Sequence, residues 1–157
     1  MITLIEALNY RCLRYISQPL GPFHVLVGPN ASGKSTFLDV VSFLSTFVSD
    51  GLEAAIQERT QNFQDLVWRR EGTGFELAIE ARIPSDKRRL LLKPDFDTIR
   101  YELALELDQD SSEILITSER GLLKADNPKR MEQQTMFPQE PCPPESILYK
   151  GSSTGKR

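Results

Sequence analysis

Apolar residues between Phe37 and Val48 recur at intervals of three and four positions, with polar residues such as Asp39 and Ser45 between them. This period is typical of an amphipathic helix with one buried face. The apolar positions are Phe37, Val40, Val41, Leu44, Phe47 and Val48. Shorter helical segments are predicted over 51–59 and, for a turn or two, over 63–68.

Further along the chain the period of the pattern falls from 3.6 residues to 2. Apolar and polar residues alternate over 75–83 and again over 99–108, and a third run covers 113–118. The polar residues of 108–112 favour a chain reversal between the last two runs. Strands of this kind, joined by short turns, form an antiparallel sheet with one face in water.

Three further strands are predicted ahead of the helix. The segments 1–7 and 12–19 form a pair joined by Asn9, Tyr10 and Arg11. The run Phe23-His24-Val25-Leu26-Val27 is short, apolar and rich in β-branched residues, which is typical of a buried parallel strand. The sequence therefore predicts an α/β fold: an incomplete P-loop NTPase core followed by an antiparallel β lobe.

The pattern ends at Asp126. Half of the chain's ten prolines lie between Pro128 and Pro144, in a polar stretch that can be neither helix nor central strand. We therefore divide the chain into 1–125, an amino-terminal ATPase subdomain with its β lobe, and 126–157, a proline-rich linker or disordered tail.

The candidate chemistry lies between the third strand and the helix, where GPNASGKST fills every fixed position of the phosphate-binding pattern G-x-x-x-x-G-K-S/T. Backbone N–H groups of such a loop and of the following helix start point at an anion. We expect nucleotide contacts from Gly28, Pro29, Asn30, Ala31, Ser32, Gly33, Lys34, Ser35 and Thr36. Lys34 is the candidate catalytic residue at the β- and γ-phosphates, Ser35 the Mg²⁺ ligand, and Thr36 a contact of the α-phosphate.

Composition narrows the class of protein. With 39% hydrophobic and 26% charged residues, the chain has the make-up of a soluble globular protein, and its net charge of −3 argues against a constitutive nucleic-acid binder. Cys12 and Cys142 are too far apart in sequence to suggest a metal knuckle or a disulfide framework, and are interpreted as bystander thiols. No apolar run approaches the length of a membrane span, so we expect a cytoplasmic protein without a membrane partner.

The strand pair containing Asn9-Tyr10-Arg11, followed by HVLVGPNASGKSTFLDVVSFL, resembles the opening of ABC-type ATPase heads of the recombination and chromosome-maintenance kind. These include RecF-type ATPases, structural maintenance of chromosomes proteins, and bacterial AAA ATPases related to overcoming-lysogenization-defect (OLD) nucleases. Their loop is commonly GPNGSGKS, so Ala31 stands where glycine is usual. The resemblance covers about Met1 to Glu119.

The resemblance implies ATP and Mg²⁺ as ligands and a second ATPase head as a partner, with DNA or an effector nuclease as further possible partners. It also implies that Arg11 contacts the phosphates, although a solvated turn residue is an equal alternative. The signature segment and the Walker B run of four apolar residues before Asp-Glu, which such heads carry after the lobe, have no counterpart here. The first hypothesis is therefore a truncated ATPase head that hydrolyses ATP when a carboxy-terminal half completes it.

Two other functions use a phosphate loop of this kind. A binding-only nucleotide sensor or interaction module would need no Walker B carboxylates. A small-molecule kinase or GTPase is disfavoured, since the chain has no N-K-x-D run and no arginine-rich lid.

Other candidate residues have plainer interpretations. His24 is expected on a core or sheet face, and Trp68 as a packing residue under the lobe. The basic clusters 69–70 and 87–89 are expected to be solvated turns, with contact to a DNA backbone as the alternative. Gln133 and Gln134 lie where these heads place a metal-sensing glutamine, but a polar dipeptide in a proline-rich tail is weak support.

Overall fold

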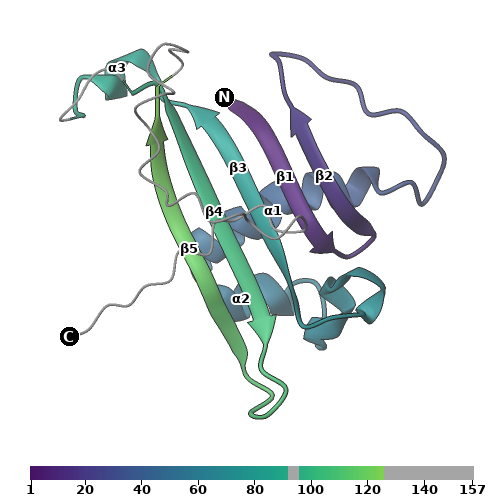
Figure 1. Cartoon of the computed structure of the whole chain (residues 1–157). Helices are drawn as coiled ribbons and strands as arrows, with labels where there is room; N and C mark the ends of the chain where they lie inside the picture. Colours follow the sequence, from purple (N-terminus) through teal and green to yellow (C-terminus); the bar gives the residue numbers. More distant parts are fainter. Residues whose placement is uncertain (92–95, 126–157) are drawn as a thin grey trace, which may run out of the picture.

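A computed structural model describes residues 1–91 and 96–125 of the chain. In this part, one antiparallel sheet forms the front layer and helices α1 and α2 lie behind it (Figure 1). The five strands have the order β2-β1-β3-β4-β5. They are β1 (Ile2–Tyr10), β2 (Leu13–Pro19), β3 (Gly74–Arg82), β4 (Thr98–Leu107) and β5 (Ile114–Lys124).

The two amino-terminal strands belong to the same sheet as the lobe, which corrects the predicted division into a core and a following lobe. β1 pairs with β2 on one side and with β3 on the other, both antiparallel, and Ile5 lies opposite Ile79. The pairing is favourable because β1 and β3 alternate in phase, so their apolar side chains share the face that meets α1. No strand pair among the described residues is parallel.

The alternating pattern correctly predicted β3 and β4, whereas β5 is longer than the predicted run 113–118. It continues to Lys124 and pairs along the whole of β4, with a register shift between Ala104 and Leu105. Its second half contains Glu119, Arg120 and Gly121, which interrupt the apolar alternation. Pairing with β4 therefore determines the extent of β5 more than its own pattern does.

Helix α1 (Lys34–Asp50) confirms the predicted helix and begins inside the phosphate-binding motif. Its buried residues are Phe37, Val40, Phe43, Leu44 and Phe47, whereas Val48 is 66% exposed. Phe43 was not in the predicted stripe, although it lies three residues after Val40 and four before Phe47. The buried face of α1 is thus rotated slightly around the helix axis from the predicted face.

The remaining helical segments are short. α2 (Leu52–Gln57) lies within the predicted 51–59, and two 3-10 turns, η1 (Phe63–Leu66) and η2 (Trp68–Arg70), occupy the region predicted to form a turn or two. α3 (Ser85–Arg88) joins β3 to the β4 side of the sheet and was not predicted.

An aromatic cluster fixes α1 against the sheet. Phe75 of β3 lies at its centre, with ring centroids 4.9 Å from Tyr10, 5.5 Å from Phe43 and 5.5 Å from Phe63. Tyr10, Phe43 and Phe75 are almost completely buried. Tilted and edge-on ring pairs of this kind add to the free energy gained from burying apolar area. The cluster therefore holds the middle of α1 against β1 and β3.

The opposite face of the sheet carries an ion-pair cluster around Arg100. Its guanidinium lies 2.6 Å from Glu6, 3.1 Å from Glu80 and 2.6 Å from Glu102. Burial lowers the pKa of Arg100, but hydrogen bonds to Glu102 and Glu6 outweigh this and raise it above its ordinary value. The cluster joins β1, β3 and β4 by side chains as well as by their backbone ladder.

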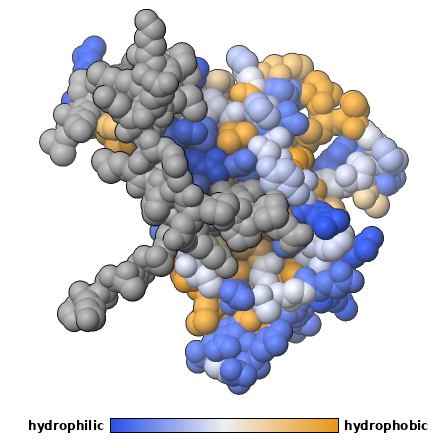
Figure 2. All heavy atoms as spheres, in the orientation of Figure 1, coloured by the Kyte–Doolittle hydropathy of each residue, from blue (hydrophilic) through white to orange (hydrophobic). Residues whose placement is uncertain are grey.

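The predicted strand over Phe23–Val27 is wrong for the described structure. Residues 21–32 form no strand or helix and are exposed, with Phe23 at 82% and Val27 at 85% exposure. A parallel strand needs a neighbouring strand to pair with, and none of the described strands pairs with this segment. Figure 2 shows hydrophobic side chains at the molecular edge where this segment runs from β2 to α1.

Among the described residues, no helix is both long and apolar enough to cross a membrane. The predicted tail 126–157, with Cys142, Gln133 and Gln134, lies outside the described residues.

Candidate nucleotide-binding site

The phosphate-binding motif bends sharply into the start of α1. Gly33 has φ of 90°, in the left-handed region, and its amide carbonyl accepts the first helical hydrogen bond from Phe37 N at 2.8 Å. A Cβ at Gly33 would lie 3.2 Å from Cys12 Sγ and 3.3 Å from Leu13 Cδ2, so these two side chains would have to shift slightly to admit a larger residue. At Gly28 an added Cβ would come within 2.9 Å of Ser32 Oγ. Glycine is therefore favoured at Gly33 by its conformation and at Gly28 by the close approach of Ser32.

Lys34 lies across the inside of this bend. Its ammonium donates hydrogen bonds to the carbonyls of Gly28 at 2.9 Å and Pro29 at 2.6 Å, and to Ser32 Oγ at 3.2 Å. All three acceptors belong to the loop itself, so the positive charge is held at its centre. The helix start adds to this positive potential, because no side chain caps it and its first turn has no acidic residue.

The two hydroxyl residues after Lys34 differ in their surroundings. Ser35 is exposed at the start of the helix. Thr36 is half-buried, and its Oγ1 accepts a hydrogen bond from Cys12 Sγ at 3.2 Å. Cys12, predicted to be a bystander thiol, is exposed and contacts the motif directly.

Asp39, one helical turn after Ser35, connects α1 to three other segments. Its Oδ2 accepts from Tyr10 Oη at 2.6 Å and Arg11 Nη1 at 3.1 Å, and its Oδ1 accepts from Arg59 Nε at 2.9 Å. Burial and the Asp39 hydrogen bond raise the pKa of Tyr10 above its ordinary value. Arg11, predicted either to contact phosphate or to be a solvated turn residue, lies in the β1–β2 turn as an ion pair with Asp39, its side chain 41% exposed.

A cavity of about 600 Å³ opens beside Thr36. Its lining is polar and aromatic, with two arginines and a tryptophan: Arg11, Cys12, Thr36, Asp65, Trp68 and Arg69. The Arg69 guanidinium lies 4.5 Å from the centroid of the Trp68 ring, and the Arg14 guanidinium 5.4 Å from it. Trp68 is thus a half-buried cavity wall near the motif, and not only a packing residue under the lobe.

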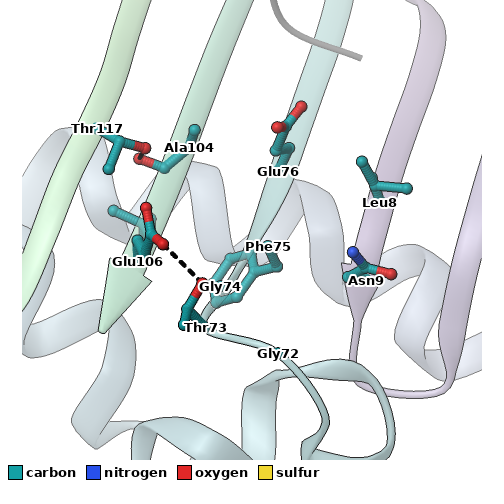
Figure 3. A pocket seen from close by; sticks show the side chains of 11 residues that line it. Leu8, Asn9, Gly72, Thr73, Gly74, Phe75, Glu76, Ala104, Glu106 and Thr117 are labelled. Atoms are coloured by element: carbon teal, nitrogen blue, oxygen red, sulfur yellow. Dashed lines mark hydrogen bonds between the residues drawn. The ribbon is translucent and has the colours of Figure 1, made fainter. Parts of the chain in front are cut away.

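A smaller hollow of about 230 Å³ lies on the sheet face that carries the ion-pair cluster. Figure 3 shows Glu76 and Glu106 among its side chains, and Glu106 accepts a hydrogen bond from Thr73 at 2.6 Å. Two carboxylates in so small a space repel phosphate. This hollow therefore does not suit a nucleotide.

Several sequence-based interpretations need revision at the site. His24 is exposed, and its Nε2 accepts from Gly21 N at 2.5 Å, so the prediction of a core or sheet-face imidazole is wrong. The roles of Asp39 and Arg59 were missed, because a polar residue on a helix and an arginine beyond it carry no motif. In the described part of the chain, no group of three or more histidine, cysteine or carboxylate residues is arranged to hold a metal ion.

The glycine-hinged bend, the central lysine and the bare helix start are the features of a P-loop. The family model for "AAA domain, putative AbiEii toxin, Type IV TA system" matches residues 23–130. This chain belongs to that family of P-loop ATPase domains. Among curated proteins it is similar to the OLD nuclease of Thermus scotoductus, with 41% identity over 44 residues. That alignment covers 28% of this chain and 8% of the nuclease.

Proposed function

We propose that this protein binds ATP with Mg²⁺ through Gly28–Thr36 and acts as an ATPase head of the recombination, DNA-maintenance or defence type. The observation that carries the proposal is Lys34, whose ammonium is held inside the glycine bend by Gly28 O, Pro29 O and Ser32 Oγ. Phosphate oxygens are stronger acceptors for an ammonium than neutral carbonyls. Binding would therefore move Lys34 from the loop carbonyls to the β- and γ-phosphates.

The residues around the motif fit a magnesium ion held mainly by phosphate and water. Mg²⁺ in nucleotide sites takes one or two protein oxygens. The exposed Ser35 hydroxyl at the helix start is such an oxygen, whereas the nearby Asp39 carboxylate is occupied by Tyr10, Arg11 and Arg59. When bound, the ion would neutralise phosphate charge; Lys34 and the helix-start amides would orient the phosphates. Arg11, with its partly exposed side chain, would reach the same phosphates by exchanging Asp39 for them.

Hydrolysis, in this proposal, requires a carboxy-terminal half with Walker B and signature residues, together with a second head. Two observations support it. Asp39, the first acidic residue of α1 after Lys34 and Ser35, is engaged by Tyr10, Arg11 and Arg59, so its carboxylate is not free to orient a water molecule. The apolar segment Phe23–Val27, next to the motif, is exposed and would pair with the strands of such a half. DNA or an effector nuclease is a further proposed partner, in keeping with the similarity to the OLD nuclease.

The engagement of Asp39 also favours a second candidate function, a nucleotide sensor that binds without turnover. Measuring ATP hydrolysis by the chain alone and with a candidate second half distinguishes the two. ATP hydrolysis that appears only when the second half is added supports the ATPase head. Tight ATP binding without hydrolysis, even with the second half present, supports the sensor. A rate above about 1 per second for the chain alone would contradict the need for completion.

The test of nucleotide binding itself is Lys34→Ala, followed by calorimetry with ATP and Mg²⁺. We expect at least a tenfold loss of affinity, since the variant removes the point charge at the centre of the bend. Lys87→Ala, in the exposed helix α3, is the matched control and should bind like the native chain. Unchanged binding by Lys34→Ala would refute the assignment of the loop.

A further inference from the structure

The cavity beside Thr36 lies where a nucleotide would continue beyond its phosphates. In the proposed binding mode, on which this inference rests, Lys34 contacts the β- and γ-phosphates and Thr36 the α-phosphate. The ribose and base follow the α-phosphate, so they leave the loop on the side of Thr36. The cavity lined by Thr36 and Trp68 opens on this side, and its volume of about 600 Å³ is within the usual range for small-molecule sites.

The lining of this cavity suits an aromatic ring. Trp68, the first residue of the 3-10 turn η2, presents a half-buried indole. The guanidinium of Arg69 lies over the indole, 4.5 Å from the ring centroid. Among the described residues, the guanidinium of Arg69 forms no ion pair with a carboxylate. Bases stack readily on tryptophan and on the plane of a guanidinium.

The backbone around this cavity is also held in an unusual conformation. Arg11, Arg69 and Arg70 have φ of 53°, 53° and 57°, in the left-handed region that side chains with a Cβ disfavour. Arg11 and Arg69 both line the cavity. Backbone strain of this kind gathers at ligand sites, where the surrounding structure maintains it.

We infer that the cavity of Arg11, Thr36, Trp68 and Arg69 binds the base and ribose of the nucleotide, with Trp68 as the stacking platform. Arg69 moves aside or stacks on the other face of the base, because its exposed side chain is free to rotate on a long stem. The phosphate loop then supplies affinity for polyphosphate, and Trp68 distinguishes a nucleotide from polyphosphate alone.

Trp68 is the chain's only tryptophan, so its fluorescence reports directly on this cavity. We expect ATP with Mg²⁺ to quench or shift the emission, because a base would contact the indole. Inorganic tripolyphosphate should bind the loop without a comparable change. An emission that ATP leaves unaltered at saturating concentration would overturn the inference.

Calorimetry with the same two ligands provides the second test. Trp68→Ala should lower the affinity for ATP about tenfold and leave the affinity for tripolyphosphate unchanged. Arg69→Ala, which removes an exposed side chain without risk to folding, should weaken ATP binding less, in the same ligand-selective way. Tyr15→Ala is the control, since it removes an exposed aromatic ring of β2 outside the cavity.

The pattern of results separates this inference from the proposed function. If the native chain binds neither ligand, the nucleotide-binding proposal itself fails. If it binds both equally, and neither variant changes ATP affinity, the loop assignment stands and the inference about the cavity is wrong. An equal loss for both ligands in Trp68→Ala would show a structural effect on the loop and would also overturn the inference.

Discussion

Ala31 is the residue of the phosphate loop whose side chain and backbone conformation are in conflict. Its φ of 64° lies in the left-handed region, where a Cβ costs about 1–2 kcal/mol. We predict that Ala31→Gly raises the free energy of unfolding by about 1 kcal/mol, because the relief of strain exceeds the extra entropy of an unfolded glycine. Denaturant unfolding of the two proteins measures the difference.

Ala54→Gly is the control for this prediction, since Ala54 lies inside helix α2 with ordinary helical geometry. There the same replacement should lower the free energy of unfolding by about 1 kcal/mol. Two changes of the same sign would show that the loop does not hold Ala31 in a strained conformation.

The residue scale is also where the sequence was most informative. The spacing of Gly28 and Gly33 predicted the positive-φ turns and the close backbone approach of the loop, because both depend on local geometry. The contact of Lys34 with phosphates stays a prediction. The hydrogen bonds of Asp39 could not be predicted in this way. They join residues 20 to 29 positions apart in the chain, and only the packing of α1 on the sheet brings these together.

At the scale of elements, β1 and α1 are joined by the buried hydrogen bond from Tyr10 to Asp39. Burial and this carboxylate raise the pKa of Tyr10 in the folded state, whereas an unfolded tyrosine ionises near pH 10. The stabilisation is therefore complete below about pH 10 and is lost as the pH rises further, because the unfolded chain then releases a proton that the folded chain retains.

The alkaline limb of a stability curve tests this hydrogen bond. Above pH 10, Tyr10 should contribute a loss of about 1.4 kcal/mol per pH unit. Tyr10→Phe should be about 1 kcal/mol less stable at pH 7, but its stability should fall less steeply in alkali. Some slope will remain, because burial and Glu119 also raise the pKa of Tyr101. Parallel curves above pH 10 would contradict the role given to Tyr10.

Helices and strands with one buried face and one wetter face could be predicted from the sequence. Segments whose structure depends on pairing with strands far away in the chain could not. Helix α1 and strands β3 and β4 show their periods in sequence because each has one buried and one wetter face. The segment Phe23–Val27 has the composition of a parallel strand. A strand also needs neighbouring strands to pair with, and composition cannot show whether these are present. Similarly, the extent of β5 follows from its pairing with β4.

For the whole molecule, the five-stranded sheet joins the two ends of the described chain into one scaffold beneath the candidate site. β1 lies between β2 and β3, so the turn that carries Arg11 and Cys12 is fixed by both the amino-terminal hairpin and the lobe. The sequence analysis predicted these parts as a core and a following lobe, since strand order depends on pairing between residues about 75 positions apart, such as Ile5 and Ile79.

The exposure of Phe23–Val27 at the edge of this scaffold leads to a matched test on two valines. Val27 is 85% exposed, so Val27→Ala should change the free energy of unfolding by less than about 0.5 kcal/mol. Val40 is fully buried on α1, and Val40→Ala should cost about 2 kcal/mol through lost burial and a cavity.

Chemical denaturation of both variants measures these costs. A small effect at Val27 means that the segment contributes little to the stability of this sheet, which leaves its backbone and apolar side chains available to strands from a completing half. An equal loss in the two variants would place the segment in the core and remove this support for completion. The segment before the phosphate loop would then not be available to pair with strands of a second half.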